Sequence, residues 1–231
     1  MAFAIDAWWE DLAQSDDEIE SLDLIRRDLE ASIELLEYHE SFSKSASQSA
    51  LNAYAALSGA GPYDRETIRH EMLRVDRQSL KIPTAAYTEL LSTGNLRVIQ
   101  DRSLRDAIVR FYESVELSEF IVEKNNDVFL DRQLIGVYFG QGLILPHAQQ
   151  DLGTAYLNDQ TRIIGQRLGE GFVHQPDPIW SFEPDSRQWQ VLRSLLLNAA
   201  NIHLVGEITA QETIVDALNL LEKIEEWQAM N

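Results

Sequence analysis

The chain has no cysteine among its 231 residues. This absence excludes disulfide bonds, thiolate metal ligands and a thiol nucleophile, and it leaves the cellular compartment open. Basic residues are also scarce, with 19 Lys and Arg against 38 Asp and Glu and a net charge of −19. A chain this acidic repels phosphate backbones, so the composition argues against nucleic acid as a partner.

The signatures of common catalytic sites are missing as well. No histidine follows a carboxylate at the three-residue spacing of di-iron helix bundles, and there is no Gly-x-Ser-x-Gly elbow, Walker-type loop or Gly-x-Gly-x-x-Gly motif. His174 and Asp177, in a proline-rich stretch, form a weak candidate loop site of low specificity. We therefore expect no cofactor or bound metal and lean against catalysis.

Glycine and proline are also absent from residues 2–40, and apolar residues recur there at spacings of three and four. This periodicity predicts one long amphipathic helix, whose acidic face we expect to be solvated. Residues 1–43 contain thirteen acidic and two basic residues. A Ser- and Ala-rich stretch follows, and we expect a further length of helix whose small side chains allow close approach of a neighbour. The predicted apolar stripe consists of Ile5, Trp8 or Trp9, Leu12, Ile19, Leu22, Ile25, Leu29, Ile33 and Leu36.

A helix–turn–helix corner is predicted between Thr84 and Val115. Gly94 stands where a helix ends in a left-handed residue, and Asp101 or Ser103 is placed to start the next helix. DNA binding by this corner is disfavoured by the charge. The corner motif comprises Tyr87, Leu90, Ser92, Gly94, Leu96, Asp101, Leu104 and Arg105.

The remaining sequence also indicates helices. The sequence predicts one helix at residues 64–80. The second helix of the corner is expected to continue towards Leu143, with a bend near Asn125 and Asn126. Glycines and prolines predict an irregular loop at about residues 168–185, followed by a last helix whose stripe includes Leu218. The fold class is therefore all-α: a long-helix bundle with one helix–turn–helix corner and one long irregular loop. We expect residues 13–231 to form a single helical-bundle domain.

The N-terminal sequence MAFAIDAWWEDLAQ sets residues 1–12 apart. Its apolar stub is too short to span a bilayer and lacks the charged and apolar regions of a signal peptide. Either it begins the buried stripe of a helix, or it is the end of a membrane-spanning helix whose earlier residues are missing. In the second case Phe3, Ile5, Trp8 and Trp9 lie at the membrane interface, where tryptophan is enriched.

Two segments resemble uncharacterised bacterial single-span membrane proteins that carry a helical extracytoplasmic domain of unknown function. One is AFAIDAWWEDLAQ with the following LDLIRRDLEASIELLE, and the other is YTELLSTGNLRVIQDRSLRDAIVRFY. The resemblance covers about half of the chain and implies a location at the inner membrane with the domain facing the periplasm. The scarcity of basic residues before Arg26 agrees with that orientation. If Met1 is the true start, a cytoplasmic location is the alternative.

The function expected from these features is protein–protein interaction or sensing by a membrane-tethered helical domain. The partner is expected to be another protein or a second copy of the chain. Two alternatives stay open: a hydrolase or metal-dependent enzyme with a site assembled from scattered residues, and a soluble cytoplasmic helical scaffold.

Overall fold

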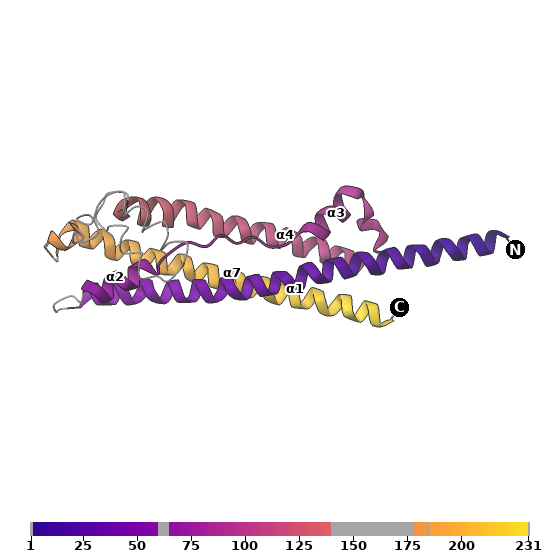
Figure 1. Ribbon diagram of the computed structural model, residues 1–231, viewed down its shortest axis with the longest axis horizontal. Helices are drawn as coiled ribbons and strands as arrows, with labels where there is room; N and C mark the ends of the chain where they lie inside the picture. Colours follow the sequence, from indigo (N-terminus) through magenta and orange to yellow (C-terminus); the bar gives the residue numbers. More distant parts are fainter. Residues whose placement is uncertain (1, 60–64, 140–177, 184, 231) are drawn as a thin grey trace, which may run out of the picture. The chain divides into compact units, whose positions relative to one another are not determined.

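The structure is a computed structural model, and it describes residues 2–59, 65–139, 178–183 and 185–230 (Figure 1). Every regular element in these residues is a helix, which confirms the predicted all-α class. Two elements, η1 and η4, are short 3-10 helices, and η2 is a π-helix. In chain order the helices are α1 (Ala2–Ser58), α2 (Arg65–Leu73), α3 (Ala85–Thr93), η1 (Asn95–Val98), α4 (Arg102–Asn125), η2 (Asn126–Phe139), η4 (Pro178–Ser181) and α7 (Arg187–Met230).

The chain divides into two compact units, each described by itself below. Unit 1 consists of the chain up to Glu40, Leu80–Ile121 and the chain from Ile208 onward, and unit 2 consists of Ser41–Ser79 and Val122–Glu207. Three of the boundaries fall inside α1, α4 and α7, so these helices contribute to both units. The single domain expected from residue 13 stays a prediction.

The buried side chains of α1 alternate at spacings of four and three along the helix. This is the heptad spacing of a coiled-coil seam, so one face of α1 packs along its length. Of the predicted stripe, Leu22, Ile25, Leu29 and Leu36 are buried and Ile33 is half-buried. Ile19 was wrong: its side chain is 38% exposed, and the neighbouring Glu18 occupies the buried position. The side-chain surroundings of Ile5, Trp8, Trp9 and Leu12 lie outside the described part of the structure. The residues at this spacing are Glu18, Leu22, Ile25, Leu29, Ser32, Leu36, His39, Ser43, Ala46, Ala50, Ala53 and Leu57, and Ser21 and Ser49 beside them are also buried.

The Ser- and Ala-rich stretch is the C-terminal part of the same helix, as predicted. Its buried positions carry small residues, including Ala46, Ala50 and Ala53. The Ser47 hydroxyl donates a hydrogen bond to the Ala200 carbonyl of α7 over 3.0 Å. Contact between a short side chain and a backbone oxygen requires the two helices to lie close together, which the small residues permit.

In unit 1, α1, α4 and α7 lie side by side (Figure 1). The Ser118 and Thr213 hydroxyls share a buried hydrogen bond of 3.1 Å between α4 and α7, and the Gln228 amide donates to Asp23 of α1 over 3.1 Å. Leu218, predicted to be in the buried stripe of α7, is 48% exposed, and Leu220 is buried instead. Leu218 is one of several closely spaced leucines there, and the heptad seam buries Leu220 instead.

The α-helix α4 is followed directly by the π-helix η2, and buried residues continue from one to the other. As far as Ser118, the buried residues of α4 are three and four apart. After Ser118 the buried residues are four apart, at Val122, Asn126, Leu130 and Leu134. The four-residue spacing begins within α4 and continues into the π-helix η2, which starts at Asn126. A π-helix has more residues per turn because its hydrogen bonds run from i to i+5, so wider spacing keeps one face buried. The predicted continuation of helix past Asn125 is confirmed as far as Phe139.

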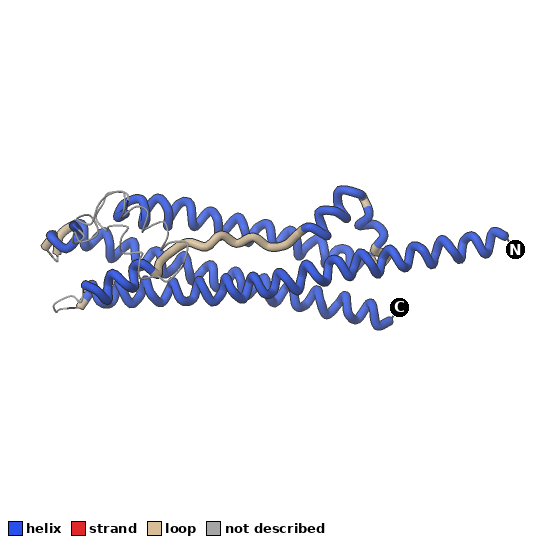
Figure 2. The backbone as a smooth tube through the Cα atoms, viewed as in Figure 1, coloured by secondary structure: helices blue, strands red, loops and turns tan. Residues whose placement is uncertain are grey.

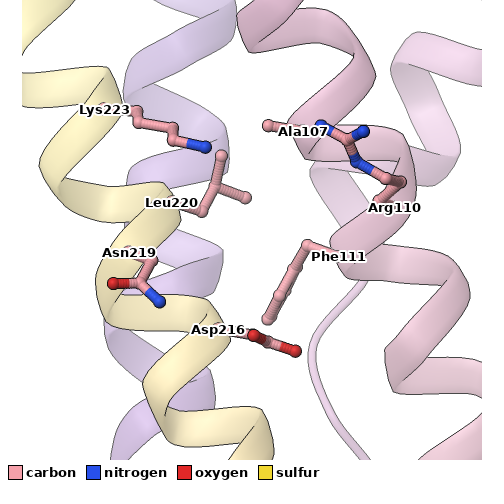
Figure 3. Close-up of a pocket in the computed structure, with 7 residues that line it drawn as sticks. All are labelled: Ala107, Arg110, Phe111, Asp216, Asn219, Leu220 and Lys223. Carbon is pink, nitrogen blue, oxygen red and sulfur yellow. The ribbon is translucent and has the colours of Figure 1, made fainter.

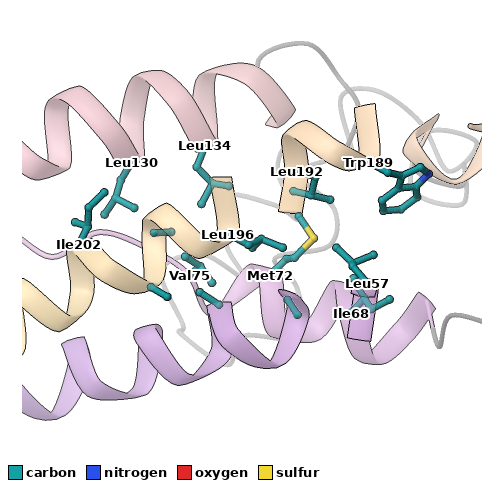
Figure 4. Packing of buried hydrophobic residues seen from close by; sticks show 14 of the residues in the cluster. Leu57, Ile68, Met72, Val75, Leu130, Leu134, Trp189, Leu192, Leu196 and Ile202 are labelled. Carbon is teal, nitrogen blue, oxygen red and sulfur yellow. The ribbon is translucent and has the colours of Figure 1, made fainter. Parts of the chain in front are cut away.

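Unit 2 has its own apolar core, drawn in Figure 4. Side chains from α1, α2, η2 and α7 meet there, among them Leu57, Met72, Leu130 and Leu196. Trp180 and Phe182 pack against this core, and the Trp189 ring nitrogen donates to the Phe182 carbonyl over 3.2 Å. Most of the predicted loop at residues 168–185 lies outside the described residues.

Between α2 and α3 the chain is extended, seen as the long loop in Figure 2. The sequence predicted helix up to about Leu80, but α2 ends at Leu73. The backbone is held in the extended form by side chains of neighbouring helices: the Ile82 amide donates to Glu119 over 2.7 Å, and the Asn126 amide donates to the Gln78 carbonyl over 3.0 Å. These contacts satisfy backbone groups that a helix would otherwise pair internally.

Candidate functional site

The predicted corner in unit 1 is formed by α3, η1 and the start of α4. Gly94 ends α3 with φ 73°, in the left-handed region, and its amide donates to the Leu91 carbonyl over 3.3 Å. The Asp101 carboxylate accepts the Leu104 amide over 3.0 Å at the start of α4. Both roles were predicted from the sequence. At the start of α3, Thr84 occupies the N-cap position but makes no capping hydrogen bond with its side chain.

The remaining corner residues support this turn. Leu90 and Leu104 are buried, Leu96 is half-buried, and the Ser92 hydroxyl bonds the Glu89 carbonyl over 3.0 Å. The Arg105 guanidinium donates to the Ile99 carbonyl over 3.1 Å. These contacts are internal to the corner, so the motif serves the fold.

Carboxylates of α1 bind backbone amides of the corner. Glu18 accepts the Gln100 amide over 2.7 Å, and Asp28 accepts the Ala86 amide over 2.9 Å. Glu18 is almost fully buried. Part of the acidic face expected to be solvated therefore binds the two ends of the corner, because unpaired amides at a helix start favour carboxylate acceptors.

Two tyrosines stack beside this carboxylate pair. The rings of Tyr87 and Tyr112 are 4.3 Å apart and nearly parallel, and the Tyr112 hydroxyl is buried without a hydrogen-bond partner among the described residues. Burial, followed by the charge of Asp28 and then Tyr87, raises the pKa of Tyr112 well above its usual range. Burial and the nearby Glu113 also raise the pKa of Tyr87. Both tyrosines are therefore neutral near pH 7 and are unsuited to act as bases.

The predicted membrane-interface residues belong to α1. Phe3, Ile5, Trp8 and Trp9 lie within its continuous helical backbone, and the surroundings of their side chains fall outside the described part of the structure. The weak candidate pair His174 and Asp177 also lies outside the described residues. The structure thus brings the residues of the corner motif together. The predicted membrane-interface residues and the His174–Asp177 pair stay predictions.

A cleft of about 320 Å³ lies between α4 and α7 in unit 1 (Figure 3). Ala107, Phe111 and Leu220 are buried and form its apolar floor, and four exposed polar residues surround them. In Figure 3 the ends of Arg110 and Lys223 lie on opposite sides of the cleft, and Asp216 is farther along α7. The lining residues are Ala107, Arg110, Phe111, Asp216, Asn219, Leu220 and Lys223. Sequence reasoning missed this site, because its residues are over 100 positions apart and match no motif.

The other hollows are less informative. One of about 540 Å³ in unit 2 involves Tyr54, Gly59, Asp185 and Arg193, but it adjoins residues outside the described ranges. Another, of about 240 Å³, is lined by residues of α1 alone. Within the described ranges, no group of three or more His, Asp or Glu side chains is arranged to hold a metal ion.

Large apolar side chains are exposed on both helices that form the cleft. On α4, Leu117 is 58% and Phe120 63% exposed; on α7, Ile208 and Val215 are also exposed. Leu117 lies seven residues after Arg110 and therefore on the same face of α4, and Ile208 and Val215 are likewise seven residues apart on one face of α7. We call Leu117, Phe120, Ile208 and Val215 the α4/α7 apolar surface.

None of the helices described has a segment long and apolar enough to cross a membrane. Comparison with family models, with curated proteins and with solved structures finds no match for this chain.

Proposed function

We propose that this chain is a non-catalytic helical binding domain that docks a basic, apolar segment of a protein partner on the α4/α7 apolar surface. The observation that carries the proposal is the exposure of Leu117 and Phe120, two large apolar side chains three residues apart on one face of α4. Single exposed apolar residues are ordinary on protein surfaces, whereas a group on adjoining helices marks an interaction surface.

The spacing of these residues suits a helical partner. Leu117 and Phe120 are one turn apart on α4, and Ile208 and Val215 are two turns apart on α7. An amphipathic helix presents apolar residues at matching intervals and buries them between two helices of its receptor. Burying the aromatic ring of Phe120 gives such a contact its largest apolar area.

The charge around the surface favours a basic partner over a second copy. Glu113, Glu116 and Glu123 are exposed on α4, and Glu212 and Asp216 are exposed on α7. Complementary charge accelerates association and selects partners, whereas two copies that each carry a net charge of −19 repel each other.

Two synthetic helices test this proposal by isothermal titration calorimetry with the full chain. One has a leucine stripe on a lysine background, and the other has the same stripe on a glutamate background. We expect the Leu–Lys helix to bind, with an affinity that falls as salt is added, and the Leu–Glu helix not to bind. Equal binding of both, or binding of neither, would contradict the proposal. Sedimentation of the chain alone is the third arm: a dimer lost in Phe120→Glu would assign the surface to self-association and overturn the basic partner.

We also propose that the domain is tethered to the inner membrane through its N-terminus and faces the periplasm, with Phe3, Ile5, Trp8 and Trp9 at the interface. The continuous helical backbone of α1 supports this proposal, since it joins the apolar stub directly to unit 1. Fractionation of the natively expressed protein, with protease treatment of intact spheroplasts, is the test. Membrane pelleting with cleavage from outside is expected, and a protected protein in the soluble fraction would contradict the location.

A further inference from the structure

Four basic residues of unit 1, Arg27, Arg97, Arg110 and Lys223, have no ion pair or hydrogen bond to another described residue. Arg26, Lys81 and Arg102 each pair with a carboxylate on a neighbouring turn or segment. Within the described residues, neither Arg110 nor Lys223 has an ion pair or hydrogen bond. Acidic residues outnumber basic ones two to one in this chain. Arg110 and Lys223 differ from the other two unpaired cations, Arg27 and Arg97, in that both line the same cleft.

The two cations face each other above an apolar floor. Figure 3 shows the Lys223 ammonium and the Arg110 guanidinium on opposite sides of the cleft, with Ala107 and Leu220 between them. Like charges facing each other are unfavourable, and an anion placed between them removes the repulsion and gains charge-assisted hydrogen bonds. The Asn219 amide, also on the cleft, adds a neutral donor.

We infer that the α4/α7 cleft binds a small organic carboxylate, with its carboxylate between Arg110 and Lys223 and its apolar part on Phe111 and Leu220. The volume of about 320 Å³ is at the lower end for ligand sites and suits a single ring or a short branched chain. Asp216 lies two turns from Lys223 on α7, so it repels a second carboxylate placed at that end. The site thus selects monocarboxylates over extended dicarboxylates.

Phenylacetate is the probe, titrated into the full chain at low ionic strength by calorimetry or ligand-observed NMR. Phenylacetamide lacks the charge, acetate lacks the apolar part, 2-phenylethylamine has the opposite charge, and inorganic phosphate is an anion without a ring. We expect phenylacetate to bind at least about five-fold more tightly than each of these, because it alone satisfies both the cations and the floor. Equal binding of phenylacetamide or phosphate would overturn the assignment, as would tighter binding of the amine.

Substitutions separate this site from general electrostatics. Arg110→Gln and Lys223→Gln each remove one cation at an exposed position and are expected to weaken phenylacetate binding about five-fold. Arg97→Gln is the matched control, since Arg97 is also exposed but lies outside the cleft, and it should leave the affinity unchanged. Asp216→Asn should strengthen binding by removing a repulsive charge. Equal weakening by Arg97→Gln, or weakening by Asp216→Asn, would refute the inference, and far-UV circular dichroism checks that each variant is folded.

Discussion

Replacing Tyr112 by Phe is expected to stabilise the protein. The Tyr112 side chain is buried, its hydroxyl has no hydrogen-bond partner among the described residues, and its ring stacks on Tyr87 at 4.3 Å. Burying an unbonded hydroxyl costs about 1–3 kcal/mol in mutational data, while phenylalanine keeps the ring stack. Taking the low end, we expect Tyr112→Phe to raise the free energy of unfolding by about 1 kcal/mol, or Tm by about 2–4 °C in a chain of this size.

The effect should grow at alkaline pH. The folded state raises the pKa of Tyr112 above its ordinary value of about 10, since burial and the charges of Asp28 and Tyr87 disfavour the tyrosinate. The stabilisation from this shift is therefore present below about pH 10 and is lost as pH rises above it, because the unfolded tyrosine ionises first. Phenylalanine cannot ionise, so its advantage should increase by about 1 kcal/mol between pH 8 and pH 11.

Urea unfolding followed by far-UV circular dichroism at the two pH values measures both effects. Tyr38→Phe is the control, because Tyr38 is 63% exposed and its substitution should change the stability by less than about 0.5 kcal/mol. A Tyr112→Phe protein that is less stable by 1 kcal/mol or more would show that the hydroxyl makes a favourable bond. A pH-independent difference between the two proteins would refute the argument from burial and charge.

Three further substitutions test the corner and the α4–α7 contact, each by thermal unfolding. Gly94→Val should lower stability by about 1 kcal/mol or more because φ is 73°, whereas Gly94→Asn should be tolerated since asparagine adopts this conformation; equal effects would point to space rather than φ. Asp101→Ala removes the cap on the Leu104 amide and should cost about 1 kcal/mol, and an unchanged Tm would mean that the cap is dispensable. Ser118→Ala deletes a buried hydrogen bond to Thr213 and should cost about 1 kcal/mol, with a null effect counting against that contact.

Local chemistry explains what the sequence predicted well. Gly94 and Asp101 act within one turn of their own backbone, so residue type and spacing suffice to assign their roles. The buried residues near the start of α4 can also be read locally, since Ile108, Phe111 and Val115 stand at helical spacing in the sequence.

Errors arose where tertiary contacts decide between neighbouring residues. Glu18 is buried in place of Ile19 because its carboxylate binds the Gln100 amide, a partner 82 residues away. The extended chain after α2 depends on the distant Glu119, which no local pattern reveals. The cleft likewise needs α4 and α7 to meet, so the pairing of Arg110 with Lys223 is visible only in the fold.

The most direct test of the proposed docking function compares two leucines that are equally exposed. Leu117, in the α4/α7 apolar surface, and Leu91, on α3, are both 58% exposed. Binding of the Leu–Lys helix is measured for the native chain, for Leu117→Glu and for Leu91→Glu. We predict that Leu117→Glu weakens binding at least ten-fold, as expected for a central contact residue, while Leu91→Glu leaves the affinity within about two-fold. Equal affinities for the two variants would contradict the proposal that this surface binds the partner.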